Sequence, residues 1–290
     1  MMISSGMEQF LMKSTRTNKK VIPGFGLTMG ITVSMLSLLI LIPLASILVK
    51  SLSLSPSEFM EIILAPKVLY AFGTSILCSF IAASVNSVFG LILAWTLVRF
   101  EFPGKRILDG LIELPFALPT AVAGITLSKL YSDTGFIGAF FATFGIQISY
   151  THIGLTIALI FIGIPFVVRA VQPVLEKLDT QFEEAAYTLG ASRRTAFFRV
   201  ILPELRPALL VGFGLAFARG IGEYGSVIYI SGNSEKNHTQ VISYIIMQKL
   251  NYMDYSGATA IALVMLVISF VLLFLINLVQ IHQAKRTNDV

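Results

Sequence analysis

Six apolar runs, each long enough to cross a membrane, constrain this chain more than any other feature. A transmembrane helix needs about 20 mostly apolar residues. Runs of about this length occur at 28–49, 70–98, 111–131, 153–172, 206–231 and 258–281. Backbone polar groups in lipid must be satisfied within the segment itself, so each run is predicted to be helical. With 55% hydrophobic and 13% charged residues, the chain is predicted to be an all-α integral membrane protein with six transmembrane helices.

The first run has a second interpretation, because Lys13, Arg16, Lys19 and Lys20 precede it as they would in a secretory signal. The run is longer than the apolar part of a signal, and no clear small-x-small cleavage site precedes Lys50. We therefore expect a retained helix.

The distribution of Lys and Arg predicts the orientation. Fifteen of them fall in the N-terminal tail, the loop after the second run, the segment 169–206 and the C-terminal tail, whereas five fall on the alternate side and Arg219 lies within a run. Positive residues are enriched on the cytoplasmic side, so both termini are expected in the cytoplasm. The net charge of +5 is then explained by the orientation in the membrane and gives no indication of nucleic-acid binding.

The chain carries no recognisable catalytic or metal-binding motif. Its single cysteine, Cys78, excludes disulfides and thiolate clusters, and His152, His238 and His282 lie apart without ligand spacing. No zinc-protease, serine-hydrolase or phosphate-binding-loop signature occurs. We expect no catalytic residues, no metal and no cofactor in this chain, and no means of hydrolysing a nucleotide alone.

One glycine motif is rejected. Residues 220–225 spell G-x-G-x-x-G, but a dinucleotide fingerprint follows a strand in a βαβ unit. Here the preceding residues belong to a membrane helix, so the glycines are better explained by close helix packing or a helix break.

The segment 169–206 differs from the rest because it holds 11 charged residues. Its apolar residues nevertheless recur with helical spacing, at Phe182, Ala185, Ala186 and Leu189. Thr180 and Glu183 have the spacing of a capping box at the start of this first helix.

A second short helix is predicted to follow. Gly190 stands where a left-handed residue would end the first helix, and Ser192 can cap a helix carrying Phe197, Val200 and Ile201 on one face. The pair Leu202-Pro203 is expected to stop it and to open the fifth span. Periodicity alone leaves open whether this hairpin lies on the membrane surface or in a groove of another protein.

The spacing of this segment is similar to that of a known family. Glu184-Ala185-Ala186, Gly190, Val200 and Leu202-Pro203 resemble the EAA loop of membrane permeases of ATP-binding-cassette (ABC) importers; only Val200 departs, since isoleucine is more usual there. Further stretches at 113–124, 164–169, 171–176 and 219–223 look like the CysT-type permeases of sulfate/thiosulfate importers. The likeness runs from about Pro23 to the end of the sixth span.

The resemblance implies a type I importer permease fold with a defined domain organisation. Residues 1–22 would form a cytoplasmic tail, 23–281 the six-span permease, and 282–290 a second cytoplasmic tail. The core transmembrane domain would cover about 66–281, and the EAA coupling loop about 176–205, here called the 176–205 hairpin.

The resemblance also implies partners. The chain would pair with a CysW-type permease, dock two copies of an ATPase that binds ATP and Mg, and receive sulfate or thiosulfate from an extracytoplasmic binding protein. It would be a transport subunit rather than an enzyme, in a bacterial inner membrane or a plastid inner envelope. The ATPase-docking residues would be Glu183, Glu184, Ala185, Ala186, Gly190, Leu202 and Pro203.

Arg219 and Glu223 are the only strongly polar pair deep in a predicted span. At about 1.5 Å per residue, Arg219 lies roughly 20 Å beyond Arg206, and charges at such depth face partners or a water-filled path. An i, i+4 ion pair that locks the fifth helix is one interpretation. The other is that Arg219 lends positive potential to an anion pathway, with Glu223 orienting it.

Two alternative functions stay open at this point. The transported anion could be a related oxyanion such as molybdate, or the chain could be a secondary anion transporter independent of ATP. Secondary transporters have inverted repeats with ionisable groups in both halves, and here such groups occur only around Arg219 and Glu223.

Overall fold

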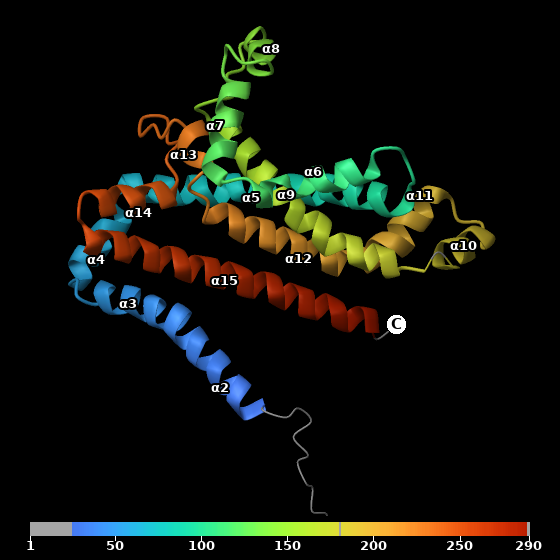
Figure 1. The fold of residues 1–290 in the computed structure, drawn as a ribbon, viewed down its shortest axis with the longest axis horizontal. Helices are drawn as coiled ribbons and strands as arrows, with labels where there is room; N and C mark the ends of the chain where they lie inside the picture. Colours follow the sequence, from blue (N-terminus) through green and yellow to red (C-terminus); the bar gives the residue numbers. More distant parts are fainter. Residues whose placement is uncertain (1–24, 180, 289–290) are drawn as a thin grey trace, which may run out of the picture. The chain divides into compact units, whose positions relative to one another are not determined.

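The computed structural model describes residues 25–179 and 181–288, and every regular element in these ranges is helical (Figure 1). The helices fall into two compact units that divide between Ser46 and Ile47 and are described separately. The first helical stretch is α2 (Phe25–Leu36), the π-helical turn η1 (Ser37–Leu41) and α3 (Ile42–Ser51). The remaining helices are α4 (Pro56–Leu64), α5 (Pro66–Arg99), α6 (Lys105–Ala117), α7 (Thr120–Tyr131), α8 (Gly138–Ala142), α9 (His152–Lys177), α10 (Gln181–Thr188), α11 (Arg193–Ala196), η2 (Phe197–Ile201, a π-helical turn), α12 (Leu202–Ile221), α13 (Val227–Ile230), α14 (Ile242–Asn251) and α15 (Tyr255–Asn288).

Within the described residues, five helices are long and apolar enough to cross a membrane, and a sixth span results if the bent pair α6 and α7 counts as one. The five are Phe25–Ser51, Pro66–Arg99, His152–Lys177, Arg193–Ile221 and Tyr255–Val279. The prediction of an all-helical membrane protein is therefore confirmed. The predicted N-terminal tail, 1–22, lies outside the described residues, and α15 continues through most of the predicted C-terminal tail to Asn288.

The prediction of one span at 111–131 is wrong in detail, because α6 and α7 meet at an angle of 112°. Helix α6 ends at Ala117, and Leu118 and Pro119 have extended ψ angles of 136° and 129°. A residue before proline is disfavoured in the helical region, so Leu118 cannot continue the helix easily. Helix α7 projects away from the long helices and carries α8 beyond its end (Figure 1).

The fifth span also differs from the predicted 206–231. The helix begins at Arg193 and ends at Ile221, and α13 is a separate short helix. The prediction that Leu202-Pro203 stops a helix is wrong. Before the proline, the N–H of Leu202 donates to the carbonyl of Phe197, five residues back. Proline has no N–H to donate, and the π-helical turn carries the chain into α12, where Pro203 lies in the first turn.

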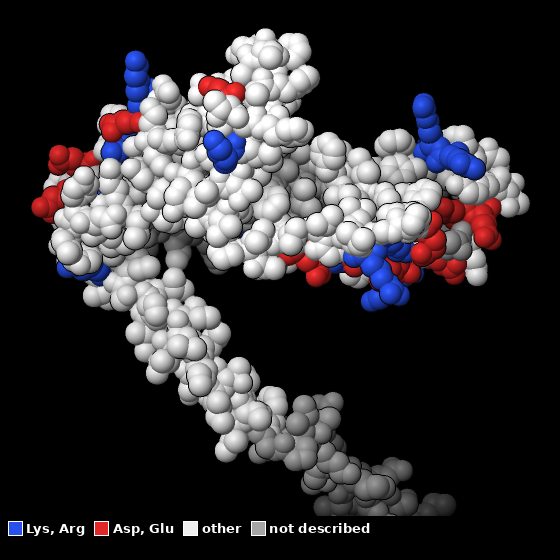
Figure 2. Space-filling view, turned by 45° about the horizontal axis from the view of Figure 1, so that its top comes forward, with Lys and Arg blue, Asp and Glu red and all other residues white. Residues whose placement is uncertain are grey.

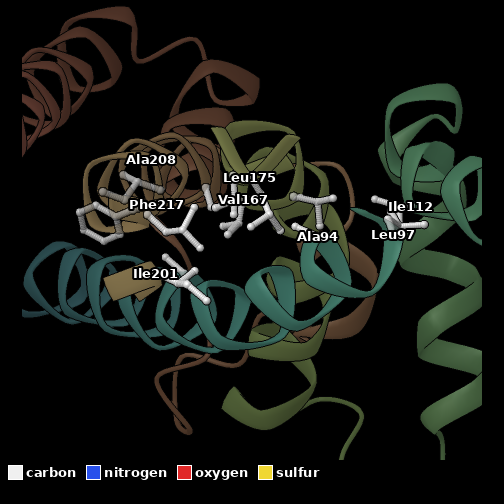
Figure 3. Packing of buried hydrophobic residues seen from close by; sticks show 14 residues of the cluster. Ala94, Leu97, Ile112, Val167, Leu175, Ile201, Ala208 and Phe217 are labelled. Carbon is white, nitrogen blue, oxygen red and sulfur yellow. The ribbon is translucent and has the colours of Figure 1, made fainter. Parts of the chain in front are cut away.

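The core of the larger unit forms where α5, α9 and α12 pack together. Val167 and Leu175 of α9 lie between Ala94 of α5 and Phe217 of α12 (Figure 3). Fourteen buried apolar residues from α5, α6, α9, η2 and α12 make up this cluster. Leu97 and Ile112 extend it from the end of α5 to α6 (Figure 3).

Small residues allow these helices to approach closely. A Cβ atom on Gly212 of α12 would lie 2.8 Å from the Cα atom of Val167, and one on Gly90 of α5 would lie 2.7 Å from its Cγ1 atom. Helices in lipid have little hydrophobic driving force between them, so close van der Waals packing at small residues stabilises their association.

Charged side chains gather mostly at two ends of the long helices, with a largely uncharged band between them (Figure 2). Large apolar side chains of the long helices are exposed, among them Phe80, Phe89 and Ile92 of α5 and Phe270 and Phe274 of α15. Charged ends around an apolar band match the depth profile of a bilayer.

Replacing Gly212 with Ala tests the helix packing. The added methyl group must displace the α9 backbone, so we expect a loss of about 1–3 kcal/mol, typical of overpacked cores. Thermal unfolding of the purified protein in detergent should show a Tm lower by several degrees. Gly73→Ala is the matched control, because a Cβ on Gly73 of α5 meets nothing within 4 Å. Equal Tm values for the two variants would contradict this packing.

Candidate functional site

The 176–205 hairpin has two helical arms. Helix α10 begins with an Asp179 cap, whose Oδ1 accepts a hydrogen bond from the N–H of Gln181 at 2.9 Å. Thr180 of the predicted capping box lies outside the described residues. The carboxylate of Glu183, its predicted partner, contacts Arg99.

Gly190 ends the first arm as predicted. Its φ is +82°, and the N–H of Ala191 donates to the carbonyl of Ala186 at 3.0 Å. A Cβ atom on Gly190 would meet nothing within 4 Å. The left-handed backbone, rather than lack of space, therefore requires glycine here.

The second arm is the start of the fifth span. Ser192 caps it as predicted, since its Oγ accepts from the N–H of Thr195 at 3.2 Å. Because α11, η2 and α12 follow without interruption, this arm and the span form one helix. Leu202 and Pro203 lie at the root of the hairpin, partly buried.

The face predicted to be apolar is largely uncovered. Phe182 is 58% exposed and Leu189 88% exposed, whereas Ala186 is buried against the second arm. Glu184 and Ala185 are exposed as well. This chain therefore leaves a compact patch, formed by Phe182, Glu184, Ala185 and Leu189, open to a partner or to the membrane surface.

Two residues that the sequence did not single out hold the hairpin from beneath. Arg99, the last residue of α5, donates from Nη2 to Glu183 Oε1 at 2.7 Å. One turn earlier, the Trp95 ring meets the Phe197 ring edge to face, with centroids 5.4 Å apart. The only signal in the sequence is a charged residue at the boundary of the second apolar run.

Three of the four stretches that resemble the permease family, 113–124, 164–169 and 171–176, meet at one place. Arg169 of α9 donates to Glu113 Oε1 of α6 at 2.7 Å and pairs with Asp109 Oδ1 at 2.9 Å. It also donates to Gln172 Oε1 at 2.6 Å, and Gln172 donates to Glu176 Oε1 at 3.0 Å. These contacts tie α6 to the end of α9 that leads into the hairpin.

Arg219 and Glu223 form the predicted ion pair. Glu223 lies beyond the end of α12, in the break before α13, and not in a continuous span as expected. Its side chain is 2% exposed and that of Arg219 is 35% exposed. Glu223 Oε1 also accepts from the N–H of Ser226 at 2.9 Å, and its carbonyl accepts from Ser243 Oγ at 2.6 Å.

This arrangement fits both interpretations of the pair. The buried carboxylate of Glu223 accepts two further hydrogen bonds, both from Ser226. The backbone carbonyl of Glu223 accepts from Ser243 Oγ, and this contact joins the break between α12 and α13 to α14. The Arg219 side chain, in contrast, is 35% exposed, so it is not sealed off from its surroundings beside the helix break. Whether an anion passes Arg219 stays a prediction.

The described residues contain no group of three His, Cys, Asp or Glu side chains that could hold a metal ion. Cys78 is a buried free thiol. His152 and His238 are joined by a hydrogen bond from the ring to the His238 carbonyl, at 3.0 Å, rather than through their two rings.

Comparison with known proteins defines the class. The family model of the binding-protein-dependent transport system inner membrane component matches residues 86–289. The chain therefore belongs to this family of membrane components of transport systems. It is 46% identical over 270 residues to the sulfate transport system permease protein CysT of Salmonella typhimurium, covering 93% of this chain and 97% of that protein. It is also 46% identical to the probable sulfate transport system permease protein cysT of Nephroselmis olivacea, covering 85% of this chain and 86% of that protein.

The fold agrees with solved transporters. A chain of a bacterial alginate ABC transporter, crystallised with an alginate pentasaccharide-bound periplasmic protein, superposes with a TM-score of 0.74. The two chains are 16% identical, and the match covers 91% of this chain and 94% of the other. The predicted ABC importer permease fold is thus supported by structure as well as by sequence.

Replacing Gly190 with Ala tests the hairpin turn. A left-handed conformation costs a non-glycine residue about 1–2 kcal/mol, which should raise local opening about 5–30-fold. Limited trypsin digestion of the detergent-solubilised protein should then cleave faster at Arg193 and Arg194. Gly110→Ala, at a helical glycine with open space around it, should leave the rate unchanged. Unchanged cleavage of Gly190→Ala would contradict the assigned turn.

Proposed function

We propose that this chain is the membrane-spanning permease subunit of an ABC importer for sulfate or thiosulfate. The observation that carries the proposal is the 46% identity to a sulfate transport permease over 93% of the chain. The chain itself is a transport subunit and not an enzyme.

The energy would come from a separate ATPase that docks on the 176–205 hairpin. The exposed Glu184, Ala185 and Gly190 offer a contact surface around the exposed Phe182 and Leu189. A short amphipathic helix seated in a groove of a partner is a common recognition mode. Glu183, Ala186, Leu202 and Pro203 are more covered and would support this surface from within.

The complete transporter would contain a CysW-type permease, two copies of the ATPase with ATP and Mg, and an extracytoplasmic sulfate-binding protein. Both termini and the hairpin would lie in the cytoplasm, in accordance with the excess of Lys and Arg on that side. The membrane would be a bacterial inner membrane or a plastid inner envelope, since relatives occur in bacteria and in Nephroselmis olivacea.

Transport would follow from movement of the hairpin. When ATP closes the two ATPase copies, the docked hairpins move with them and the two permeases rock between outward-open and inward-open states. The second arm transmits this movement directly, because Arg193–Ile221 is one helix.

Arg219 is the candidate anion-attracting group. A cation near the membrane centre is costly unless it is paired or faces water, and here it is paired with a buried carboxylate that other groups fix in place. This pairing would keep the guanidinium oriented while its exposed part contributes positive potential to the pathway.

Two alternatives differ in substrate or in energy source. A related oxyanion such as molybdate would use the same architecture, with selection made by the binding protein. A secondary anion transporter would need no ATPase.

Reconstitution in vesicles tests the function. The chain is co-purified with its ATPase, its partner permease and the binding protein, and uptake of radiolabelled sulfate is measured with and without internal ATP. We expect ATP-dependent uptake that unlabelled thiosulfate reduces and molybdate reduces less. A complex carrying Glu184→Lys should bind the ATPase poorly and lose uptake, because the charge of the exposed docking face is reversed.

Uptake independent of ATP and of the ATPase would overturn the importer assignment. Stronger competition by molybdate than by sulfate would overturn the substrate while keeping the importer. Normal docking and uptake with Glu184→Lys would remove the docking role of the hairpin.

The variant Arg219→Gln tests the anion pathway. Because the positive potential is lost and Glu223 is left as a buried unpaired carboxylate, we expect sulfate uptake to fall about tenfold or more. Co-purification with the partner permease should survive. The control is Arg106→Gln, which removes an exposed arginine at the start of α6. If Arg219→Gln no longer assembled with the partner permease, the Arg219–Glu223 pair would have a structural role alone.

A further inference from the structure

The contact between α5 and the hairpin has a chemistry of its own. Arg99 and Glu183 are joined at 2.7 Å, and each side chain is only 17% exposed. The Arg99 guanidinium also lies 5.6 Å from the centroid of the Trp95 ring. An ion pair this covered is less screened by water than a surface pair, and loss of one partner leaves the other charge uncompensated.

The same two turns of α5 hold both arms of the hairpin. Arg99 binds Glu183 on the first arm, α10. Trp95 contacts Phe197 on the second arm, η2, and edge-to-face aromatic pairs favour a defined geometry. Residues 95–99, at the end of α5, therefore join a transmembrane helix to both arms of a hairpin that is distant in the sequence.

The two arms differ in how they reach the spans. The second arm continues into α12 as one helix. The first arm is a separate eight-residue helix that begins after α9 has ended at Lys177. The Arg99–Glu183 pair gives this first arm a direct side-chain link to α5, which packs along α9 and α12 in the core.

We propose that the Arg99–Glu183 ion pair is a positioning contact that transmits displacement of α10 to α5, so that the hairpin moves α5 and α12 together. This role of the pair rests on the proposed function of the hairpin as the ATPase-docking element. Glu183 acts inward on Arg99, whereas its neighbour Glu184 faces outward. The two adjacent carboxylates therefore have different roles, the first in transmission and the second in docking.

Charge exchange tests this proposal in the reconstituted complex. The variants are Arg99→Glu, Glu183→Arg and the double exchange, and the readouts are ATPase co-purification, ATP hydrolysis and sulfate uptake. Arg99→Glu changes a residue outside the docking surface, so it should still bind the ATPase and hydrolyse ATP, while the ratio of uptake to hydrolysis falls about tenfold, within the usual range of coupling between sites. Glu183→Arg should lower the ratio to a similar extent in the complexes that form. The double exchange should restore the ratio to within about threefold of the wild type, since it rebuilds the pair.

A second ion pair, which is more exposed, provides the matched control. Lys105 and Glu101 are joined at 2.6 Å just beyond α5, but Glu101 is 88% exposed. Reversing Lys105 or Glu101 should leave the ratio unchanged. Arg99→Gln is a milder variant for the case in which charge reversal prevents folding, and it should lower the ratio without loss of ATPase binding.

Several results would overturn the proposal. These are an unchanged ratio in Arg99→Gln and the charge-reversed variants, a double exchange no better than the singles, or loss of ATPase binding in both Arg99 variants. The last would make the pair part of the docking surface. Absence of ATP-dependent uptake in the wild-type complex would refute the proposed function instead. This result is distinguishable because it needs no variant.

Discussion

The close packing of α5, α9 and α12 is the contact on which the rest of the larger unit depends. Gly90 and Gly212 bring the two flanking helices against the same residue of α9, Val167. Lipid gives little hydrophobic drive for helix association, so the shape of these surfaces and their dispersion contacts must supply the stability. The other functional parts are attached to this three-helix core: α6 through Arg169, and the hairpin through Arg99.

Charged side chains with little exposure are paired in the hairpin and at the end of α12. In the hairpin, Glu183 of α10 is paired with Arg99 of α5. At the end of α12, Glu223 is paired with Arg219 and accepts hydrogen bonds from Ser226, and its backbone carbonyl accepts from Ser243. Separating either pair would leave a poorly solvated charge without its partner, so both sites resist separation of the elements that they join.

Most of the fold could be predicted from the sequence, because apolar run length is a physical requirement of the bilayer. The Gly190 turn and the Ser192 cap were also predictable, since each depends on local backbone geometry. The bend between α6 and α7 was predictable only in part, because Pro119 indicates the place of a kink but not an angle of 112°. A proline indicates a kink or a break, and the tight approach of Gly124 to the backbone of Ser226, which fixes α7 beside α13, comes from distant residues.

The continuous fifth helix was missed for a related reason. Leu202-Pro203 reads as a stop signal, but the π-helical turn before it provides a hydrogen-bond pattern that periodicity does not reveal. The Arg99–Glu183 pair was missed because its partners are 84 residues apart. Long-range side-chain pairs of this kind leave no mark in a single sequence beyond two opposite charges.

The continuity of this helix determines how force can pass through the chain. A helix of 29 residues, at about 1.5 Å per residue, extends over roughly 44 Å from the hairpin to the Arg219–Glu223 site. A break at Leu202-Pro203 would have placed a hinge between them and absorbed movement. With no break there, the second arm moves together with the rest of the fifth span. The first arm is separate from α9, so it requires a side-chain link to move the same helices. The Arg99–Glu183 pair is the described contact that joins α10 to a transmembrane helix through paired charges.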